Sequence, residues 1–547
     1  MSQIGEKTAI TADGPEEPTD EKTVSIRFCV FFDGTLNNRT NIEQRLTAVP
    51  DNELTDEERK EAEVLKKKLA EQKANEDMLL AKPAKELTTN EITQVKAIQK
   101  ERALGTPEEL YKKYRAKRDK KTGEATEDNS YDSYYTNVVK MDRHVNTDEG
   151  KTPNYQLTLK TYIEGSGTLI KKGDRMNGYA LAMGESGVPE KVEKGMRTVL
   201  AKIRMEQPDV KVTIKKLTLD VFGFSRGAAA ARNFINDALN GRKTVSEGTT
   251  LPSNDETTSI KALLESKGYT INDVNVCFAG LYDTVSTYGL GVISDALGIT
   301  NDAANNVETL SLKAVAQAEE TVHLAAADEH RFHFSLTNIS SAGANGLEVF
   351  LPGVHSDIGG GYRDAVTESL ILRGSHDLSG IILHGNYPSV DEANKDRAQL
   401  IAAGWYQEDE IFVEPVLSKN SEGEEEVIWA TLRVHRSGKK PVGISNTYSR
   451  IPLHIMVKKA RNKQIVFKDK LDRDEAVPAE LSTIQDDIQS YVDSKGSSSQ
   501  ASDWFGTTQY SWLSKLRHDY LHFSARMSLG HDPRFKDKQR TRMTYHG

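Results

Sequence analysis

The stretch 223–227 reads Gly-Phe-Ser-Arg-Gly and fits G-x-S-x-G, the spacing of a nucleophilic serine in a sharp turn. An apolar run ends at Phe222, and the alanine-rich residues 227–231 open a predicted helix directly after it. Gly223 and Gly227 permit the turn, and small residues let strand and helix approach, which exposes the Ser225 hydroxyl above the strand end. The helix N-terminus favours developing negative charge. The pattern predicts a nucleophile elbow; the alternative is a tight turn with a surface serine.

A serine nucleophile needs a base and an orienting carboxylate, here expected in the chain order Ser, Asp/Glu, His. Asp283 in "GLYDTVS" and His355 in "LPGVHSDIGGGY" each follow an apolar run that is typical of a strand. The alternatives are a turn-capping Asp283 and a loop-capping or core His355. Asp357 is a rival orienting acid, or it holds its own loop through backbone hydrogen bonds. The other histidines are weaker bases because none lies in so glycine-rich a loop: His330, His333, His518, His522 and His531.

The stretch 31–38, "FFDGTLNN", ends another apolar run in a turn. It resembles the D-x-D-G-T-L signature of haloacid-dehalogenase-type phosphatases, but Phe31 stands where their nucleophilic Asp would be. We therefore assign the loop to an oxyanion hole, which combines the amide after the nucleophile with an amide from another strand-end loop. The predicted donors are the Arg226 amide and the amide of Gly34 or Thr35, with Asp33 fixing the loop. The alternative is a simple Asp-Gly turn.

The elements that must position these residues alternate between strand and helix after residue 22. This rhythm predicts an α/β fold with a mostly parallel sheet covered by helices on both faces, as in α/β-hydrolases, and a ligand crevice beyond the carboxyl ends of the strands. We expect a flexible arm over residues 1–22, a catalytic domain over 23–365 with a charged helical insertion at about 50–122, and a partly helical module over 366–547.

The composition is that of an ordinary soluble protein: 547 residues, 28% charged, 37% hydrophobic, with a net charge of -9. An acidic balance argues against a nucleic-acid partner. The start lacks the basic and apolar segments of a secretory signal, and no run of about 18 apolar residues appears, so we expect a chain made in the cytoplasm. Export by a machine that reads no signal peptide remains open. No compact His/Cys cluster appears, and we expect neither a metal nor another cofactor.

Six stretches, in this order, resemble a known family: "FFDGTLNN", "YIEGSGT", "GFSRGAAAAR", "GLYDTVS", "AADEHRF" and "LPGVHSDIGGGY". They are similar to the catalytic domain of the bacterial type VI secretion lipase effectors of the G-x-S-x-G, phospholipase A class. The resemblance spans about residues 24–365. It is weaker in the insertion and after residue 365, where "NTYSRIPLHIM" and "YLHFSAR" continue it.

The resemblance implies a Ser225, Asp283 and His355 triad that hydrolyses acyl esters of membrane phospholipids. It also implies toxicity to competing bacteria at the target-cell membrane or periplasm, a cognate immunity protein, and loading on a secretion spike protein of the VgrG type. Two other readings stay open: a serine hydrolase of another class, such as a peptidase or small-ester hydrolase, and a non-catalytic binding module on the same scaffold.

A phospholipase must also reach a bilayer. Residues 111–122, "YKKYRAKRDKKT", carry seven basic side chains that would each contribute on the order of 1 kcal/mol on an anionic surface. The alternative is a solvated helix face. The region after residue 365 is expected to serve as a lid, a membrane contact or a spike-docking surface.

Overall fold

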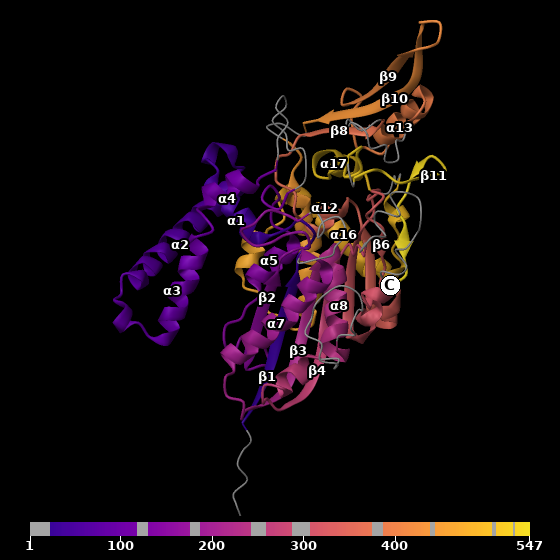
Figure 1. Ribbon diagram of the computed structural model, residues 1–547. Coiled ribbons are helices and arrows are strands. Elements are labelled where there is room, and N and C mark those ends of the chain that lie inside the picture. The colour runs from indigo at the N-terminus through magenta and orange to yellow at the C-terminus, as the bar shows by residue number, and fades with distance from the viewer. Residues whose placement is uncertain are drawn as a thin grey trace, which may run out of the picture.

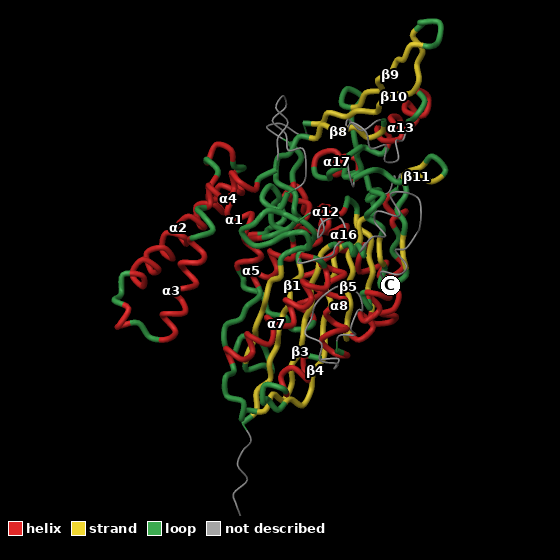
Figure 2. The backbone as a smooth tube through the Cα atoms, viewed as in Figure 1, coloured by secondary structure: helices red, strands yellow, loops and turns green. Residues whose placement is uncertain are grey.

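A six-stranded parallel sheet forms the centre of the computed structural model, which describes residues 22–116, 129–175, 186–241, 259–286, 307–374, 387–437, 443–505, 510–528 and 531–547 (Figures 1 and 2). Every neighbouring pair runs parallel, in the order β2-β1-β3-β4-β5-β7. The strands are β1 (Thr23–Phe32), β2 (Leu157–Ile163), β3 (Thr213–Phe224), β4 (Ile271–Tyr282), β5 (Ala318–Ala326) and β7 (Gly346–Leu351). The predicted α/β fold with a mostly parallel sheet is confirmed.

The inner strands β1 and β3 are buried on both faces along most of their length, which explains why the sequence shows continuous apolar runs there instead of an alternating pattern. In β1, Phe28, Val30 and Phe32 belong to one apolar cluster, whereas Cys29 and Phe31 belong to a second cluster on the opposite face. Because successive side chains of a strand point to opposite faces, this one strand contributes residues to two separate cores.

Helices cover both faces of the sheet. The first core contains residues of α7, α8 and α9, and the second contains residues of α5, α14 and α16. These helices are α5 (Asn137–His144), α7 (Val188–Glu206), α8 (Arg226–Asn240), α9 (Ile260–Glu265), α14 (Arg450–Asn462) and α16 (Ser482–Lys495). Because α14 and α16 come from the region after residue 365, this region completes one core of the catalytic sheet.

The charged insertion is helical, as predicted, and projects from the body of the molecule (Figure 1). α1 (Arg39–Ala48) precedes the insertion, whose helices are α2 (Asp56–Leu80), α3 (Thr89–Arg102) and α4 (Pro107–Tyr114). Capping boxes begin these three, each pairing a threonine with a glutamate three residues later. At the base of α2, the buried Glu58 receives hydrogen bonds from Arg45 at 2.7 Å and from Arg363 at 2.8 Å. Of the basic stretch 111–122, residues 117–122 lie outside the described residues.

The chain after α12 (His355–Gly359) adds a second, antiparallel sheet of order β8-β10-β9, which stands away from the main sheet (Figure 1). The remaining elements are β8 (Glu368–Arg373), α13 (Val390–Ala402), β9 (Ile411–Lys419), β10 (Glu425–Arg436), α15 (Lys470–Asp474), α17 (Leu513–Asp519), β11 (Phe535–Lys536), β12 (Gln539–Arg540) and β13 (Thr544–Tyr545). β13 pairs in parallel with β6 (Leu336–Thr337). The domain division at residue 365 stays a prediction, and the predicted arm, except for residue 22, lies outside the described residues.

Short 3-10 helices connect these elements: η1 (Asp51–Glu53), η2 (Ala84–Glu86), η4 (Leu312–Gln317), η5 (Ser340–Asn345), η6 (Asn446–Ser449), η7 (Ala479–Leu481), η8 (Gly496–Ser498) and η9 (Ala501–Trp504). Within the described ranges, no helix combines the length and the apolar character that crossing a bilayer requires.

Candidate active site

Ser225 lies in a strained turn between β3 and α8. Its backbone has φ 58° and ψ -128°, a conformation that few residues other than glycine adopt. A Cβ on Gly223 would lie 2.4 Å from the Gly227 carbonyl oxygen, so strand and helix can approach this closely only with glycine there. β3 continues to Phe224, two residues beyond the predicted strand end. The geometry is that of a nucleophile elbow.

The loop that follows β1 packs directly against this elbow. A Cβ on Gly227 would lie 2.2 Å from the Asp33 carbonyl oxygen and 2.4 Å from that of Phe32. A Cβ on Gly34 would lie 2.5 Å from the Phe224 ring. The glycines at 34 and 227 therefore bring the 33–35 backbone beside the serine, which is where a second oxyanion donor must be.

Asp33 fixes this loop with three hydrogen bonds. Its carboxylate accepts from the Gly34 amide at 2.8 Å, from the Thr136 hydroxyl at 2.7 Å and from the Tyr162 hydroxyl at 2.6 Å. Burial raises the pKa of Asp33 to about 6, although these bonds oppose the shift. The Gly34 amide is thus already engaged, whereas the Thr35 amide has no hydrogen bond within the described part of the chain. Of the two predicted loop donors, Thr35 is the better placed.

Asp283 and His355 are brought together from the ends of two strands. Asp283 directly follows β4, and His355 follows β7 and begins α12. His355 Nδ1 lies 2.5 Å from Asp283 Oδ2, so Nδ1 is assigned the proton and Nε2 is the nitrogen that can accept one. Asp283 has a left-handed backbone conformation, with φ 42°, and also accepts the Ala326 amide at 2.9 Å.

The base lies beside the elbow. The Phe224 ring packs on the His355 ring with 4.5 Å between centroids. Ser225, Asp283 and His355 are only 3%, 0% and 4% exposed. Ser225 and His355 both lie within the described residues, and no hydrogen bond joins Ser225 Oγ to His355. Such bonds are often long in free enzymes and shorten when substrate binds.

Arg542 is a site residue that the sequence did not indicate. Its guanidinium makes two hydrogen bonds to the Asp283 carboxylate, at 2.7 and 2.8 Å, and a third to the Phe334 carbonyl at 2.8 Å. Burial alone would raise the pKa of Asp283, but Arg542 and His355 outweigh burial and hold that pKa well below its usual range. Arg542 lies 259 residues after Asp283 in a polar segment without a motif, so no local pattern could have revealed it.

A second carboxylate holds the backbone of the base. Glu329 accepts the His355 amide at 3.2 Å, the Ser524 hydroxyl at 3.0 Å and the Arg331 guanidinium at 2.9 Å. The Phe334 ring meets the His355 ring edge-on at 5.0 Å, and the Arg331 guanidinium lies over the same Phe334 ring. Burial lowers the pKa of His355, although Asp283 opposes this, and the charge of Arg331 lowers it further.

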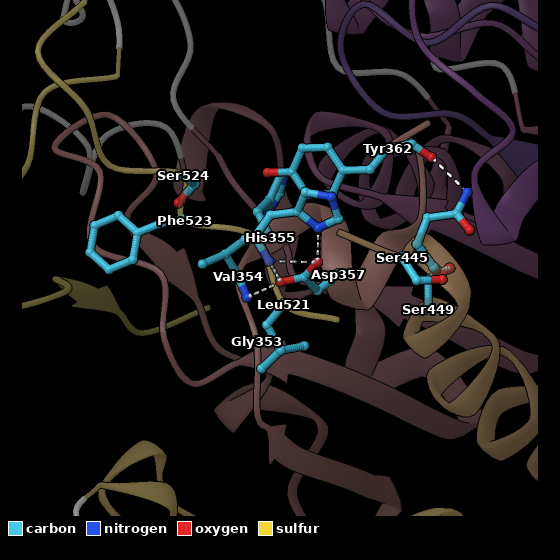
Figure 3. A network of polar contacts seen from close by, with 12 residues as sticks. Gly353, Val354, His355, Asp357, Tyr362, Ser445, Ser449, Leu521, Phe523 and Ser524 are labelled. Atoms are coloured by element: carbon cyan, nitrogen blue, oxygen red, sulfur yellow. Dashed lines mark hydrogen bonds and ion pairs between the residues drawn. The ribbon is translucent and has the colours of Figure 1, made fainter. Parts of the chain in front are cut away.

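Asp357 faces a different histidine. Its carboxylate lies 2.8 Å from His522 Nδ1 and accepts the Val354 amide at 3.0 Å (Figure 3). The ring of His355 therefore meets Asp283, and Asp357 both holds its own loop and pairs with His522. Among the other histidines weighed as bases, His518 contacts Glu410 and Asp519.

Comparison with known proteins finds one family model and solved structures similar to this chain. The family model described as "T6SS, Phospholipase effector Tle1-like, catalytic domain" matches residues 119–384. The solved "Structure of the Tle1 effector bound to the VgrG spike from the Type 6 secretion system" has a TM-score of 0.58 and 19% identity, covering 100% of this chain and 99% of that one. An uncharacterized protein from Pseudomonas aeruginosa has a TM-score of 0.35 and 15% identity, covering 89% of this chain and 53% of that one. No curated protein matches.

The matched region contains Ser225, Asp283 and His355, together with five of the six strands of the main sheet. The structural match extends the shared α/β fold over the whole chain. The resemblance seen in the sequence, to the phospholipase effectors of the bacterial type VI secretion system, is therefore confirmed.

Proposed function

We propose that this protein is an antibacterial serine phospholipase A that hydrolyses acyl esters of membrane glycerophospholipids after delivery by a type VI secretion system. The observation that carries the proposal is the strained Ser225 elbow beside a His355–Asp283 pair with a 2.5 Å hydrogen bond. The match to the Tle1-like catalytic domain supports the lipid as the substrate class.

In the first step, Ser225 Oγ attacks the ester carbonyl carbon while its proton moves to His355 Nε2. The carbonyl electron pair moves to oxygen, and the Arg226 and Thr35 amides stabilise this oxyanion. Asp283 holds the ring so that Nε2 faces the serine and balances the positive charge that forms on it. When the oxyanion collapses, the ester C–O bond breaks and His355 protonates the departing lysophospholipid oxygen.

In the second step, water removes the acyl group. His355, neutral again, takes a proton from water, and the resulting hydroxide attacks the acyl carbon of the Ser225 ester. Collapse of the second oxyanion breaks the bond to Oγ, which regains its proton from His355. The products are one fatty acid and one lysophospholipid for each water consumed.

The decisive experiment measures fatty acid and lysophospholipid released from vesicles of phosphatidylethanolamine and phosphatidylglycerol. Ser225→Ala should lose roughly four orders of magnitude or more in rate. Ser494→Ala is the matched control, because its hydroxyl donates only to the Tyr491 carbonyl in α16. Equal hydrolysis by Ser225→Ala would overturn the serine assignment. No hydrolysis by the wild type, with Ser225 still labelled by a fluorophosphonate, would indicate another class of ester.

The delivery part of the proposal concerns partners. The similar effector of known structure is bound to a VgrG spike, and we propose that this chain binds a spike protein of the same type. We also propose a cognate immunity protein in the producing cell. Expression directed to the periplasm should kill cells only when Ser225 is intact, and co-expression of the immunity protein should restore growth.

A further inference from the structure

A small polar cavity begins one residue beyond the candidate base. It has a volume of about 160 Å³ and lies between the start of α12 and residues 522–526 and 531. Ser356, which follows His355, lines it, as does Arg331, whose guanidinium lies over the same Phe334 ring that His355 meets. We call it the headgroup cavity. It is smaller than the pockets of about 300 Å³ or more that hold drug-sized ligands, so it suits a compact group and not an acyl chain.

One buried atom of its lining has no partner. His522 lines the cavity and is 3% exposed, and its Nδ1 contacts Asp357 at 2.8 Å. Its other ring nitrogen, Nε2, is buried without a hydrogen bond. The Tyr362 ring stacks on this imidazole with 3.9 Å between centroids, which holds the ring in place. Asp357 and the Tyr362 ring fix the His522 imidazole, so Nε2 is the atom that can bind a ligand.

The rest of the lining contributes further donors. Arg526 and Ser356 supply a guanidinium and a hydroxyl group, whereas Arg331 and Ser524 add groups that also donate to Glu329. Glu368 is its single acidic residue, and both of its carboxylate oxygens are already engaged, by Arg436 at 2.6 Å and by the Phe523 amide at 2.7 Å. A compact cavity lined by two arginines, with its carboxylate already paired, favours an oxyanion with several acceptor oxygens.

We propose that the headgroup cavity binds the phosphate of the glycerophospholipid substrate while the ester reaches Ser225. The proposal rests on the proposed function. The Nε2–H of His522 donates to a phosphate oxygen, and the Arg526 guanidinium supplies positive charge. Ser356, which lines the cavity, directly follows the base His355 in the chain, and a phosphate is joined to the scissile ester through the glycerol unit.

The test compares two monomeric esters that differ only in the phosphate headgroup, dihexanoylphosphatidylethanolamine and dihexanoylglycerol. Arg526→Gln should lower kcat/KM for the phospholipid about tenfold or more and leave dihexanoylglycerol within about twofold. Arg433→Gln, which removes an exposed arginine of β10 outside the cavity, should change neither. An equal loss on both substrates, or no loss on either, would overturn the proposal. His522→Gln provides a second variant with the same expectation.

A binding measurement identifies the source of the phosphate and separates this inference from the proposed function. Calorimetry of Ser225→Ala with glycerophosphoethanolamine should show binding that Arg526→Gln abolishes. Binding of inorganic phosphate alone, with equal turnover of the two esters, would assign the cavity to free phosphate and reject the headgroup role. If the wild type hydrolyses neither ester, the proposed function fails, whereas binding of glycerophosphoethanolamine would still support the cavity as a phosphodiester site.

Discussion

Asp283 has two competing partners, a histidine that becomes positive in the proposed reaction and a guanidinium that is already positive. The Arg542 fork fixes both carboxylate oxygens, which orients the acid with a precision that one hydrogen bond to His355 cannot give. Its charge also offsets part of the attraction that Asp283 exerts on protonated His355. Arg542 thus fixes the orientation of Asp283 and at the same time lowers the basicity of His355.

This balance predicts the pH dependence of an Arg542→Gln variant. Without the guanidinium, Asp283 stabilises protonated His355 more strongly, so the pKa of His355 rises and less neutral base is present at a given pH. The acid limb of kcat/KM, expected below pH 6.5 in the wild type because burial lowers the pKa of His355, should move to higher pH. The measurement is a pH–rate profile with a soluble ester.

Arg534→Gln is the control for that profile, because Arg534 lies on the same C-terminal segment and contacts Phe332 instead of Asp283. It should leave the acid limb where it is. A uniformly slower Arg542→Gln enzyme with an unmoved profile would mean that Arg542 only holds the segment in place.

At the scale of elements, the elbow depends on the contact between the N-terminus of α8 and the loop after β1. Ala at position 227 would place its Cβ 2.2 Å from the Asp33 carbonyl oxygen, a backbone atom that can move only with its loop. We expect Gly227→Ala to reduce the free energy of unfolding by about 1–3 kcal/mol and to displace the Thr35 amide, with a loss of about 10²-fold in kcat. Urea unfolding and steady-state kinetics provide the two readouts.

Gly173→Ala is the matched substitution, since the nearest atom to its Cβ would be the Tyr114 ring at 3.0 Å, a side chain that can rotate away. It should cost little stability and no activity. Full activity in Gly227→Ala would show that the loop after β1 is not part of the oxyanion hole.

The elements of the site were predictable where a strand leads into them. Ser225, Asp283 and His355 each follow an apolar strand, and parallel strands bring their carboxyl ends to one edge, so their proximity could be inferred without a structure. The partners that come from the C-terminal region could not be predicted in this way. Arg542 and His522 reach Asp283 and Asp357 across 259 and 165 residues, and neither lies at the end of a strand of the main sheet.

The hairpin of β9 and β10 is the element best suited to touch a bilayer. It extends from the body (Figure 1), and Leu417 and Val427, which pair across its strands, are 53% and 48% exposed. Ile428 beside them is 54% exposed. If the membrane-contact role proposed for the region after residue 365 is correct, Leu417→Ser with Ile428→Ser should weaken binding to phosphatidylglycerol vesicles in a flotation assay.

The same double variant should hydrolyse monomeric dihexanoylphosphatidylethanolamine at the wild-type rate. Leu69→Ser, at an exposed apolar position on α2, is the control for surface hydrophobicity alone. Unchanged vesicle binding in the hairpin variant would exclude the membrane contact and favour a docking role for the hairpin.

At the scale of the whole molecule, the region after residue 365 and the main sheet depend on each other. α14 and α16 bury the second face of the sheet, and buried ion pairs join the two regions, such as Arg517 with Asp328 at 2.9 Å. The active site itself needs both, because Arg542 and Ser524 hold residues that come from the sheet. The sequence suggested a division at residue 365 because the predicted alternation of strands and helices weakens there.

Arg436 tests this dependence. Its fully buried guanidinium donates to four carbonyl oxygens, those of Trp405, Arg517, His518 and Leu521, and to Glu368. Arg436→Met leaves these acceptors and a buried carboxylate without their donor, and we expect the free energy of unfolding to fall by about 3–5 kcal/mol. Because the regions share a core, calorimetry should show one transition at a lower temperature, with loss of esterase activity in the same range.

Arg433→Met, three positions earlier on the exposed face of β10, should change the unfolding free energy by no more than about 0.5 kcal/mol. A second calorimetric transition that stays at the wild-type temperature in Arg436→Met would mean that the sheet unfolds independently, and the division near residue 365 would then be a folding boundary. A single shifted transition would mean that the catalytic sheet cannot keep its fold without the chain that follows it, so the headgroup cavity and the Arg542 contact form together with the core.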